Sequence, residues 1–493
     1  MGFRLDRTSL LPGFAALTAT AATLLGPLRA HKLIVDGDES RLTSHIAVVL
    51  RSVASESPTM GLLRDAVTAH DRAHGTGCTL LVNLVHAFAE AALVLQAQSI
   101  DPIDIASRFQ DALAIALATC DRMVINVHEW LREASFQSAR GSPLEALGAA
   151  LISDEWEEAM AMALAIAHKI PSLLSDAYRS LTAVHWYPTA GATNTRLVDG
   201  LVVPVDLAPS LARSPTHVAS MVLIDGSIAF SQALCDALVA SHADGLVAAY
   251  GIDAQLDDWC RAHHVVCFAT LQLHAVAAAF QVPVFESTSV FVSSPQVSHL
   301  APSVLVQRYQ GSGAVDRTAE DDEPTMGFLQ LTRPGLRHVS LFVRRSCLSL
   351  AQDAVKTIQS CLARLHHARY DDRMLPGGGA VLVAIAAALQ SRENLAVIAT
   401  AFESTGLQLL QNASSLPYLE AKSTWRRVYA AYRAGFHESD KFLETAFYGR
   451  QLRLLDDHRV RFDSYVSTKD GLRAATRLVT MTAMLGPAVI NVP

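Results

Sequence analysis

The stretch Gly75-Thr76-Gly77-Cys78-Thr79 stands directly before a long apolar run at residues 80–96. The run is rich in alanine and leucine, and a helix that is apolar almost all round belongs in the centre of a helical core. A glycine-rich turn at the N-terminus of such a helix can bind phosphate, because backbone N–H groups converge there and the helix dipole favours anions. An ordinary turn with a threonine cap is the alternative.

Two further glycine turns lie far from this one in the sequence. Leu25-Gly26-Pro27 ends the first helical segment, and its simpler interpretation is a helix stop. Pro376-Gly377-Gly378-Gly379-Ala380 precedes an apolar segment that begins at Val381. Three consecutive glycines let a backbone approach a partner closely, although a flexible interdomain link would have the same composition.

The secondary structure expected from the sequence changes twice along the chain. The first 120 residues are helical in pattern, and a further helix with an acidic start is expected at residues 153–167. In the middle of the chain, short β-branched segments alternate with helix-like stretches, which predicts a small α/β domain inserted into a helical domain that both chain ends build. The expected strands are residues 196–205, 221–230, 245–250, 265–269, 282–285 and 339–343.

The composition excludes several classes of protein. The 493 residues carry a net charge of −7, which argues against a nucleic-acid partner. A hydrophobic share of 51% and a charged share of 18% exclude a disordered chain. Seven scattered cysteines without a C-x-x-C pair argue against a disulfide framework or a four-cysteine zinc site, and favour a reducing compartment.

One segment has features of a targeting sequence. Residues 8–28 carry no charge and follow Arg4 and Arg7, as in a signal peptide or a membrane anchor. Prolines, glycines and threonines interrupt the segment, so a soluble helix is expected there. No other clean twenty-residue apolar run is expected, and the sequence predicts no membrane insertion.

The three glycine turns together occur in an order and at a spacing that resemble the group II chaperonins, the t-complex polypeptide (CCT/TRiC) family. The resemblance covers nearly the whole chain. Further segments that resemble the family are residues 197–202, 221–230, 257–259, 349–354, 409–413 and 472–476.

The resemblance implies a multidomain α and α/β fold of the chaperonin type. It assigns residues 1–132 and 374–493 to a helical equatorial domain, 133–195 and 334–373 to a small intermediate domain, and 196–333 to an α/β apical domain. In the family, a helical protrusion follows the strand that resembles residues 221–230. Here residues 231–243 run almost directly into the next expected strand, so the full helical protrusion is missing.

By resemblance, the three turns form a nucleotide-binding site. Asp353 matches the family's aspartate that activates the attacking water, and its alternative interpretation is a helix-surface aspartate. The expected nucleotide-binding residues are Leu25, Gly26, Pro27, Gly75, Thr76, Gly77, Cys78, Thr79, Gly377, Gly378 and Gly379.

The departures from the family pattern concern the chemistry of this site. Thr76 stands where the family has an aspartate that helps to hold magnesium and the phosphates. Ser44-His45-Ile46 stands where the family has an NDG motif with a nucleotide-site aspartate, and Leu28 and Arg29 replace a lysine and a glycine. Magnesium-assisted phosphoryl transfer needs carboxylates to place the metal. The departures therefore weaken the expectation of ATP and Mg²⁺ as cofactors and make Asp353 a catalytic remnant; no structural metal is expected.

A degraded ATPase site and a short apical segment are similar to the McKusick–Kaufman and Bardet–Biedl syndrome chaperonin-like proteins. The resemblance then implies a cytoplasmic protein, also at the centrosome or basal body, that assists assembly of the BBSome, a ciliary trafficking complex. Its partners would be other chaperonin-family subunits and either client proteins or BBSome subunits. Two alternatives stay open: a divergent ring subunit that hydrolyses ATP to fold clients, and a binding scaffold that needs no nucleotide.

Several histidines and cysteines invite a metal-site interpretation that their spacing does not support. His70 and His74 lack a third ligand and are expected to be solvated or capping histidines. Cys260 and Cys267 flank His263-His264 at a spacing that matches no standard zinc pattern. His366-His367 is expected to form a polar helix end.

Overall fold

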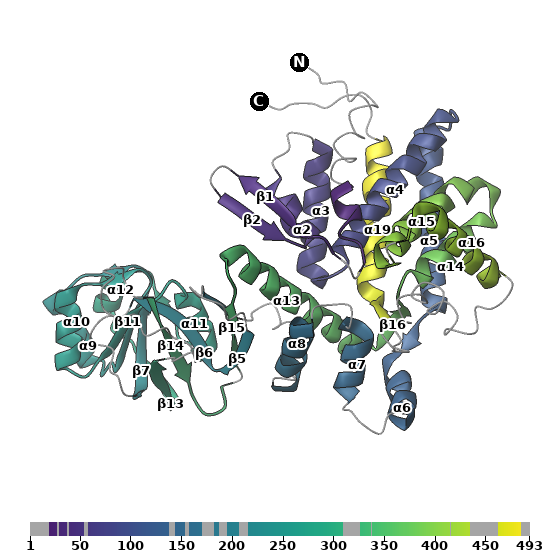
Figure 1. Ribbon diagram of the computed structural model, residues 1–493. Coiled ribbons are helices and arrows are strands. Elements are labelled where there is room, and N and C mark those ends of the chain that lie inside the picture. Colours follow the sequence, from purple (N-terminus) through teal and green to yellow (C-terminus); the bar gives the residue numbers. More distant parts are fainter. Residues whose placement is uncertain are drawn as a thin grey trace, which may run out of the picture. The chain divides into compact units, whose positions relative to one another are not determined.

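The computed structural model describes residues 19–26, 29–36, 39–53, 58–137, 143–152, 157–169, 182–186, 195–206, 215–308, 326–336, 338–414, 416–433 and 462–484. The chain divides into two units (Figure 1). Unit 1 comprises Met1–Tyr178 and Ser349–Pro493, and unit 2 comprises Arg179–Leu348. Unit 2 is thus one continuous insertion between the two segments of unit 1. The finer division into equatorial, intermediate and apical domains stays a prediction.

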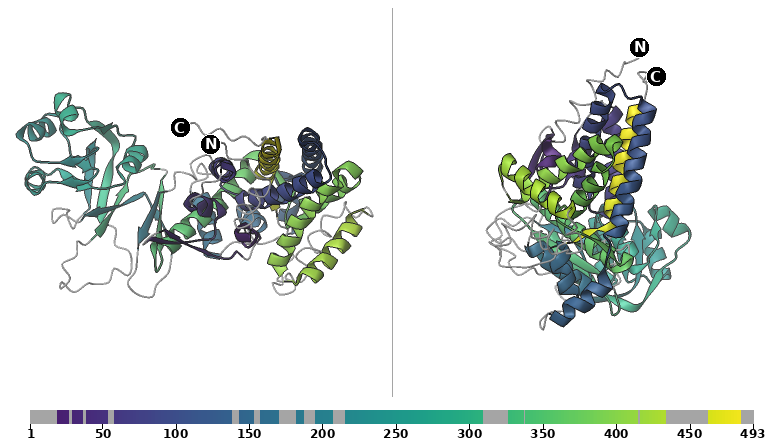
Figure 2. Two further views of the ribbon diagram at one scale, coloured as in Figure 1. Left: turned by 90° about the horizontal axis from the view of Figure 1, so that it is seen from above. Right: turned by 90° about the vertical axis from the view of Figure 1, so that its right-hand side faces the viewer.

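The core of unit 1 is a set of long helices that both of its segments supply. Helix α4 (Cys78–Ala97) contacts α15 (Ala396–Ser414) and α19 (Tyr465–Met484), and α19 also contacts α5 (Pro102–Arg122). Figure 2 shows α19, in yellow, beside the blue N-terminal helices. The other helices of this unit are α2 (Ile46–Ser52), α3 (Pro58–His74), α6 (Val127–Gln137), α7 (Pro143–Ile152), α8 (Glu157–Lys169), α13 (Leu348–Asp371), α14 (Ala380–Gln390) and α16 (Tyr418–Arg433).

Aromatic packing joins the two segments at the centre of this core. The Phe88 ring in α4 lies 5.5 Å from the ring of Phe109 in α5 and 5.3 Å from that of Phe402 in α15. All three side chains are buried. The long apolar helix predicted at residues 80–96 is confirmed as α4, whose sequence is apolar enough to be enclosed on most sides.

Helix α4 also has the length and hydropathy of a membrane-spanning helix, which the sequence analysis did not expect. Among the described residues, α4 alone is long and apolar enough to cross a membrane by length and composition. Of its most apolar 18-residue window, 61% is buried, as packing in the core of unit 1 requires. Most of the segment at residues 8–28 lies outside the described residues. In its described part, residues 19–26, only residues 19–22 are helical. Residues 153–156 of another predicted helix also lie outside the described residues, and the rest of that prediction corresponds to α8.

Unit 1 also contains short strands that the sequence analysis missed. They precede helix α2, the third glycine turn and helix α19. Strands β1 (Lys32–Asp36) and β2 (Glu39–Thr43) form an antiparallel hairpin just before α2. Strands β3 (Ile125–Asn126), β16 (Arg373–Pro376) and β17 (Phe462–Ser464) form a second sheet in the order β17-β16-β3. Strand β16 runs into the third glycine turn and β17 runs into α19, so this sheet brings two distant segments together.

Unit 2 is built on a mixed seven-stranded sheet, as the predicted α/β middle domain requires. Its strand order is β11-β9-β7-β13-β14-β6, and β12 also pairs with β7. The pairs among β11, β9, β7 and β12 are parallel, and the remaining pairs are antiparallel. These strands are β6 (Leu201–Asp206), β7 (Thr216–Ile224), β9 (Gly245–Ala248), β11 (Val266–Ala269), β12 (Val284–Phe285), β13 (Ser298–Arg308) and β14 (Met326–Thr332).

Helices cover both faces of this sheet. Helix α11 (Leu273–Phe280) packs on one face, and α9 (Gln232–Ala240) and α10 (Ala254–Ala262) pack on the other. Between β8 (Ser227–Ile228) and β9 the chain forms only α9, so no long helical extension is inserted there. The remaining elements are α12 (Thr288–Ser293), β10 (Gly251–Ile252), which pairs with β8, and a three-stranded sheet of β4 (Thr182–Trp186), β15 (Val339–Arg344) and β5 (Thr195–Asp199).

Two predicted strands are wrong in their continuity. The strand predicted at residues 221–230 is divided between β7 and β8. The sequence predicts a single strand at residues 196–205, whereas the structure has β5 and β6 separated at Gly200. Gly200 has a φ of 85°, a left-handed conformation that glycine adopts without strain. A Cβ there would lie 2.5 Å from the Leu331 carbonyl oxygen. The multidomain α and α/β fold class is nevertheless confirmed.

Candidate functional site

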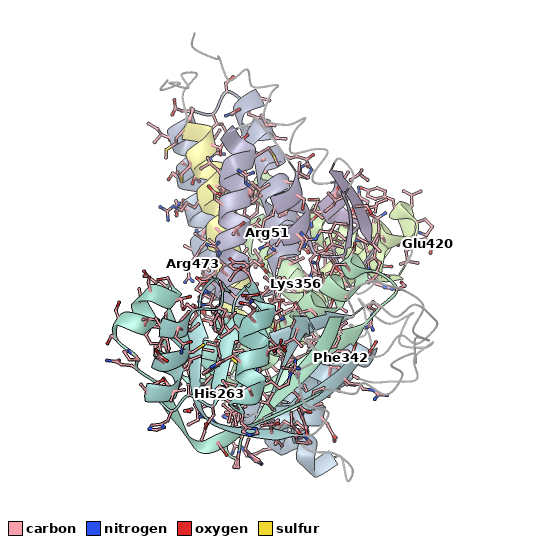
Figure 3. All side chains as sticks on the ribbon, turned by 90° about the vertical axis from the view of Figure 1, so that its left-hand side faces the viewer. Arg51, His263, Phe342, Lys356, Glu420 and Arg473 are labelled. Carbon is pink, nitrogen blue, oxygen red and sulfur yellow. The ribbon has the colours of Figure 1, made fainter. Side chains whose placement is uncertain are left out.

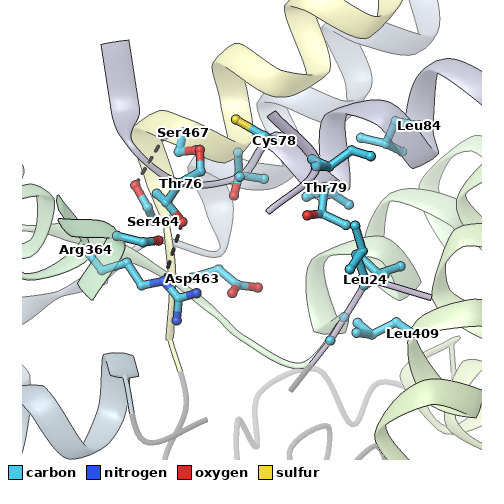
Figure 4. A pocket seen from close by; sticks show the side chains of 18 of the residues that line it. Leu24, Thr76, Cys78, Thr79, Leu84, Arg364, Leu409, Asp463, Ser464 and Ser467 are labelled. Atoms are coloured by element: carbon cyan, nitrogen blue, oxygen red, sulfur yellow. Dashed lines mark hydrogen bonds between the residues drawn. The ribbon is translucent and has the colours of Figure 1, made fainter. Parts of the chain in front are cut away.

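The three glycine turns of unit 1 meet at one pocket. Leu25 and Gly26 line it from the first turn, residues 75–79 from the second, and Gly378 and Gly379 from the third. Figure 4 shows Leu24, Thr76 and Thr79 around this pocket. Gly377 is not among its lining residues, and Pro27 lies outside the described residues.

Two helices begin at the pocket without side-chain caps. Gly77 is the N-cap of α4 with a φ of 82°, and Gly379 is the N-cap of α14 with a φ of 87°. Neither position has a side-chain hydrogen bond to the first turn of its helix. The first N–H groups of a helix have no partner within it, so both termini offer donors and positive dipole ends to an anion. The alternative of a threonine cap at the second turn is therefore wrong.

The first turn is held in place by a residue of α15. Asn412 donates from Nδ2 to the Leu25 carbonyl oxygen at 2.8 Å and to the Ala22 carbonyl oxygen at 2.5 Å. Gly26 has a φ of 98°, and a Cβ there would lie 3.2 Å from Leu409 Cδ1. This contact gives a physical role to residues 409–413, which the sequence analysis noted only for their resemblance to the chaperonins.

The charged lining of the pocket combines three cations with two carboxylates. Arg29, Lys356 and Arg364 line it together with Asp71 and Asp463. Lys356 Nζ lies 2.8 and 2.9 Å from the two carboxylate oxygens of Asp71. Arg51 Nη2 lies 3.6 Å from the same carboxylate. Figure 3 labels Lys356 and Arg51.

Arg364 contacts the second glycine turn directly. Its Nε donates to Thr76 Oγ1 at 3.4 Å; Figure 4 labels both residues. Its Nη1 donates to the Leu151 carbonyl oxygen at 3.1 Å. On the other side of the turn, Ser467 Oγ donates to the Thr76 carbonyl oxygen at 3.1 Å. Thr76 is therefore fixed by helices α13 and α19, and its side chain brings no charge to the pocket.

Two of the three residues that stand in place of the family's NDG motif also line the pocket. His45 and Ile46 line it. His45 Nε2 lies 3.0 Å from Thr357 Oγ1. Burial, with a further contribution from Arg29, lowers the pKa of His45 to about 3, so the ring is neutral at neutral pH. None of these residues offers a carboxylate.

Asp353 is buried and lies outside the pocket lining. Its carboxylate accepts hydrogen bonds from Thr43 Oγ1 at 3.0 Å, from the Ser44 N–H at 2.8 Å and from Ser44 Oγ at 3.1 Å. His31 Nε2 lies 3.2 Å from the second carboxylate oxygen. The side chain is only 6% exposed, so the alternative of a helix-surface aspartate is wrong. In this arrangement Asp353 ties α13 to the junction of β2 and α2.

Replacing Asp353 with alanine is expected to lower the free energy of unfolding of unit 1 by roughly 3 kcal/mol. The change leaves the Ser44 N–H and two hydroxyl groups without their acceptor, and hydrogen bonds to a charged group contribute about 1.5–3 kcal/mol each. Urea unfolding monitored by circular dichroism measures the effect. Asp111→Ala, at an exposed position of α5, is the matched control and should change stability by less than about 0.5 kcal/mol. Equal midpoints for the two variants would show that Asp353 does not hold this junction.

A buried histidine network lies behind the second turn, contrary to the expectation that His70 and His74 are solvated or capping histidines. His70, His74 and His367 are all buried. The rings of His70 and His74 lie 4.7 Å apart, and those of His74 and His367 lie 5.6 Å apart. His70 Nε2 contacts Ser467 Oγ at 3.2 Å. The i,i+4 spacing predicted the shared face but could not predict that α13 and α19 cover it.

Polar partners from α19 and the strand before it satisfy this network. His74 Nε2 lies 3.1 Å from an Asp470 oxygen, and His367 Nδ1 lies 2.8 Å from Ser464 Oγ. Within the described ranges, no group of three or more His, Cys, Asp or Glu side chains could hold a metal ion. The same holds for Cys260 and Cys267 in unit 2, where the Cys267 thiol instead lies 3.1 Å from Asp257 Oδ1.

The sequence analysis missed the charged lining residues of the pocket. Asp71, Lys356, Arg364 and Asp463 come from α3, α13 and β17, and no motif marks them. Lys356 follows Asp353 by three positions, which was the only signal that could have suggested it. Asp463 is the acidic residue that the late part of the chain brings to the pocket.

A comparison with known families agrees with this arrangement. Residues 17–233 match the sequence model of the TCP-1/cpn60 chaperonin family. The matched region contains the first two glycine turns, the helices of the first segment of unit 1 and the beginning of the unit 2 sheet. The match covers less than half of the 493 residues, and over that part the chain is similar to the TCP-1/cpn60 chaperonin family.

Proposed function

We propose that this chain is a chaperonin-like protein that keeps a nucleotide-shaped pocket but has lost efficient ATP hydrolysis. The family match supports the chaperonin-like part of this function. The small number of carboxylates at the pocket is the observation that supports the proposed loss of hydrolysis. Asp71 and Asp463 are its acidic lining residues among the described part of the chain, and Asp71 is already paired with Lys356.

The pocket fits a nucleotide in other respects. Its apolar wall can pack against a flat base, and the N-termini of α4 and α14 can receive phosphate groups. The Asp463 carboxylate can accept hydrogen bonds from sugar hydroxyls. The residues that form the apolar wall include Leu24, Leu84, Val381, Leu382, Ile385, Leu409 and Leu472.

Magnesium fits the pocket less well. A Mg²⁺ ion in a nucleotide site takes one or two carboxylates besides the phosphates. Thr76 and His45 supply none, and Asp353 is held by hydrogen bonds away from the pocket lining. Without that placement, the charge that develops on the transferring phosphoryl group is not neutralised in the usual way.

We further propose that the protein assists assembly of a multi-subunit complex of the BBSome type, in the cytoplasm and at the centrosome or basal body. The resemblance to the McKusick–Kaufman and Bardet–Biedl chaperonin-like proteins supports this role. The short α9 connection also supports it, since a chain without the helical protrusion could not supply a full segment of a closing lid. Other chaperonin-family subunits and client proteins would be the partners. The retained glycine turns favour the active ring subunit as the second candidate.

Phosphate release from ATP in the presence of Mg²⁺ separates the two candidates. We expect the purified chain to turn over at about 10⁻³ s⁻¹ or slower, the range of nucleotide sites with incomplete charge stabilisation. Asp353→Asn should leave this residual rate unchanged. A rate that is at least about a hundred times faster and that Asp353→Asn abolishes would establish a working ATPase instead.

A further inference from the structure

We propose that a second cavity of unit 1 binds an anionic amphiphile, a small molecule with an apolar body and a carboxylate or phosphate head. We call this cavity the α14 groove. Its described lining residues lie within 115–125, 376–392 and 432–433, and none of them lines the pocket at the three glycine turns. They come mainly from α14 and from α5 and α16, which both contact α14 (Figure 1). The groove has a volume of about 930 Å³, within the roughly 300–1,000 Å³ that is typical of small-molecule sites.

The floor of the α14 groove is apolar and is lined by small side chains. Ala384, Ala387 and Ala388 recur on α14 at spacings of three and four residues, so they share one face of the helix. An alanine side chain ends at its Cβ atom, so this face leaves space between the helices that longer side chains would fill. Ile115 and Met123 extend the apolar surface, and both pack half-buried against the core of unit 1. Such a surface suits a hydrocarbon chain or an aromatic ring, which leaves water when it binds there.

The rim of the α14 groove carries positive charge. Arg122, Arg392 and Arg433 line the groove and are exposed, and its described lining includes no Asp or Glu. Arg122 Nη2 donates to Thr119 Oγ1 at 3.1 Å, a neutral acceptor in the same helix. None of the three guanidinium groups forms an ion pair with a described residue. Burial raises the pKa of Tyr432, against the smaller effect of Arg122, so this lining hydroxyl adds no negative charge at neutral pH.

An apolar floor beside a basic rim fits a ligand that has both an apolar part and a negative charge. A guanidinium group matches two oxygens of a carboxylate or a phosphate at once, and its charge disfavours a cationic ligand. A small polar anion would leave the apolar floor in contact with water. A neutral hydrocarbon would leave the three arginines without a partner. An anionic amphiphile satisfies both parts of the groove.

A membrane surface is a weaker candidate for the same charge. It would meet the exposed arginines, but the floor of the groove is recessed, since Ala384 is 1% exposed and Pro376 is also buried. A single small amphiphile can place its apolar body on this floor while its charged head stays at the rim. The shape of the groove therefore favours a dissolved molecule over an intact bilayer.

Calorimetric titration of the full chain tests the preference for an anion. The probes are decanoate, decyl phosphate and decyltrimethylammonium, each below the concentration at which it forms micelles. We expect the anions to bind and the cation of the same chain length to bind at least about tenfold more weakly. Octanoate should bind roughly tenfold more weakly than decanoate, because two buried CH₂ groups are lost. Tighter binding of decyl phosphate would assign the ligand to phosphate esters, and tighter binding of decanoate to carboxylic acids.

Variants test where the anion binds. The double variant Arg122→Gln and Arg392→Gln should bind both anions about tenfold or more weakly than the unaltered chain. Ala387→Leu fills part of the floor without changing the charge and should also weaken binding. Arg427→Gln, at an exposed position of α16 outside the lining, is the matched control and should bind like the unaltered chain.

Four results would overturn the proposal: no binding of either anion, equal binding of the cation, equal binding by the double variant, or binding only to vesicles of an anionic phospholipid in a sedimentation assay. Circular dichroism checks that each variant is folded. If the double variant is not, Ala387→Leu and the comparison of the anions with the cation decide. Arg122 and Arg392 lie outside the pocket at the glycine turns, so the outcome does not depend on whether ATP binds or is hydrolysed there.

Discussion

Replacing Gly406 with alanine is expected to lower the free energy of unfolding of unit 1 by roughly 3 kcal/mol, the upper part of the range for overpacking a core. Gly406 lies in α15, and a Cβ there would overlap the ring of Trp425 and lie 2.6 Å from its Cη2 atom. Trp425 is a fully buried side chain of α16, so its ring cannot move into solvent to make room. The expected result is a separation of α16 from α15.

Urea unfolding followed by tryptophan fluorescence and circular dichroism measures this effect. Gly61→Ala is the matched control, because Gly61 lies in α3 and a Cβ there would meet no atom within 4 Å. That variant should be more stable by about 0.5–1 kcal/mol, since alanine favours a helix interior over glycine. If both variants unfold at the same urea concentration, α16 does not pack on α15 as the structure shows.

Lowering the pH from 7 to 4 is expected to cost unit 1 several kcal/mol of stability. Burial, followed by the neighbouring His74, lowers the pKa of His70 from 6.5 to about 4. Between these two values the unfolded chain binds a proton at this position and the folded chain does not, so the stability that is present above pH 6.5 is lost as the pH falls. The difference corresponds to about 3 kcal/mol for His70 alone.

The charged groups around His70 and around a second buried histidine, His45, also affect the expected loss of stability. Asp470 and Asp71 face His70 and oppose the shift, whereas His74 adds to it. At His45, burial and Arg29 lower the pKa to about 3, Lys356 acts in the same direction, and Asp353 and Asp71 oppose it. The two histidines therefore act in the same direction, and the loss should be steepest between pH 6 and pH 4.

Urea unfolding at several pH values between 7 and 4 measures this loss, with His70→Gln as the test variant. Glutamine can still hydrogen-bond to Ser467 but does not titrate, so the slope of stability against pH should fall by about 1.4 kcal/mol per pH unit. Gln110→Ala, at an exposed position of α5, removes no titratable group and should leave the slope unchanged. Parallel pH profiles for all three proteins would show that His70 is not held neutral by burial.

Local sequence predicted the helices and turns of the site better than its charges. The α4 helix and the turn before it could be predicted because an apolar run and a glycine-rich start are both local features. Gly26, Gly77 and Gly379 could be assigned to one site only through the resemblance to the chaperonins, since nothing local to the three turns shows that they meet.

The missed residues depend on tertiary packing. Arg364 reaches Thr76 because α13 passes beside the second turn, a relation between residues 288 positions apart in the sequence. His70 and His74 were misjudged because helical spacing defines a face and does not show what covers it. Asp353 was singled out as a catalytic remnant, and its hydrogen bonds to Thr43 and Ser44 give it a structural role that spacing alone could not indicate.

The fate of bound ATP tests the central claim, that the pocket remains while the hydrolytic chemistry is lost. The chain is incubated with ATP and Mg²⁺, separated from free nucleotide, and denatured after increasing times so that the released nucleotide can be identified. We predict that ADP accumulates no faster than about 10⁻³ s⁻¹, so that most of the bound nucleotide is still recovered as ATP after several minutes. Conversion of the bound ATP to ADP within seconds, with phosphate released in equal amount, would contradict the account and identify the chain as a working chaperonin ATPase.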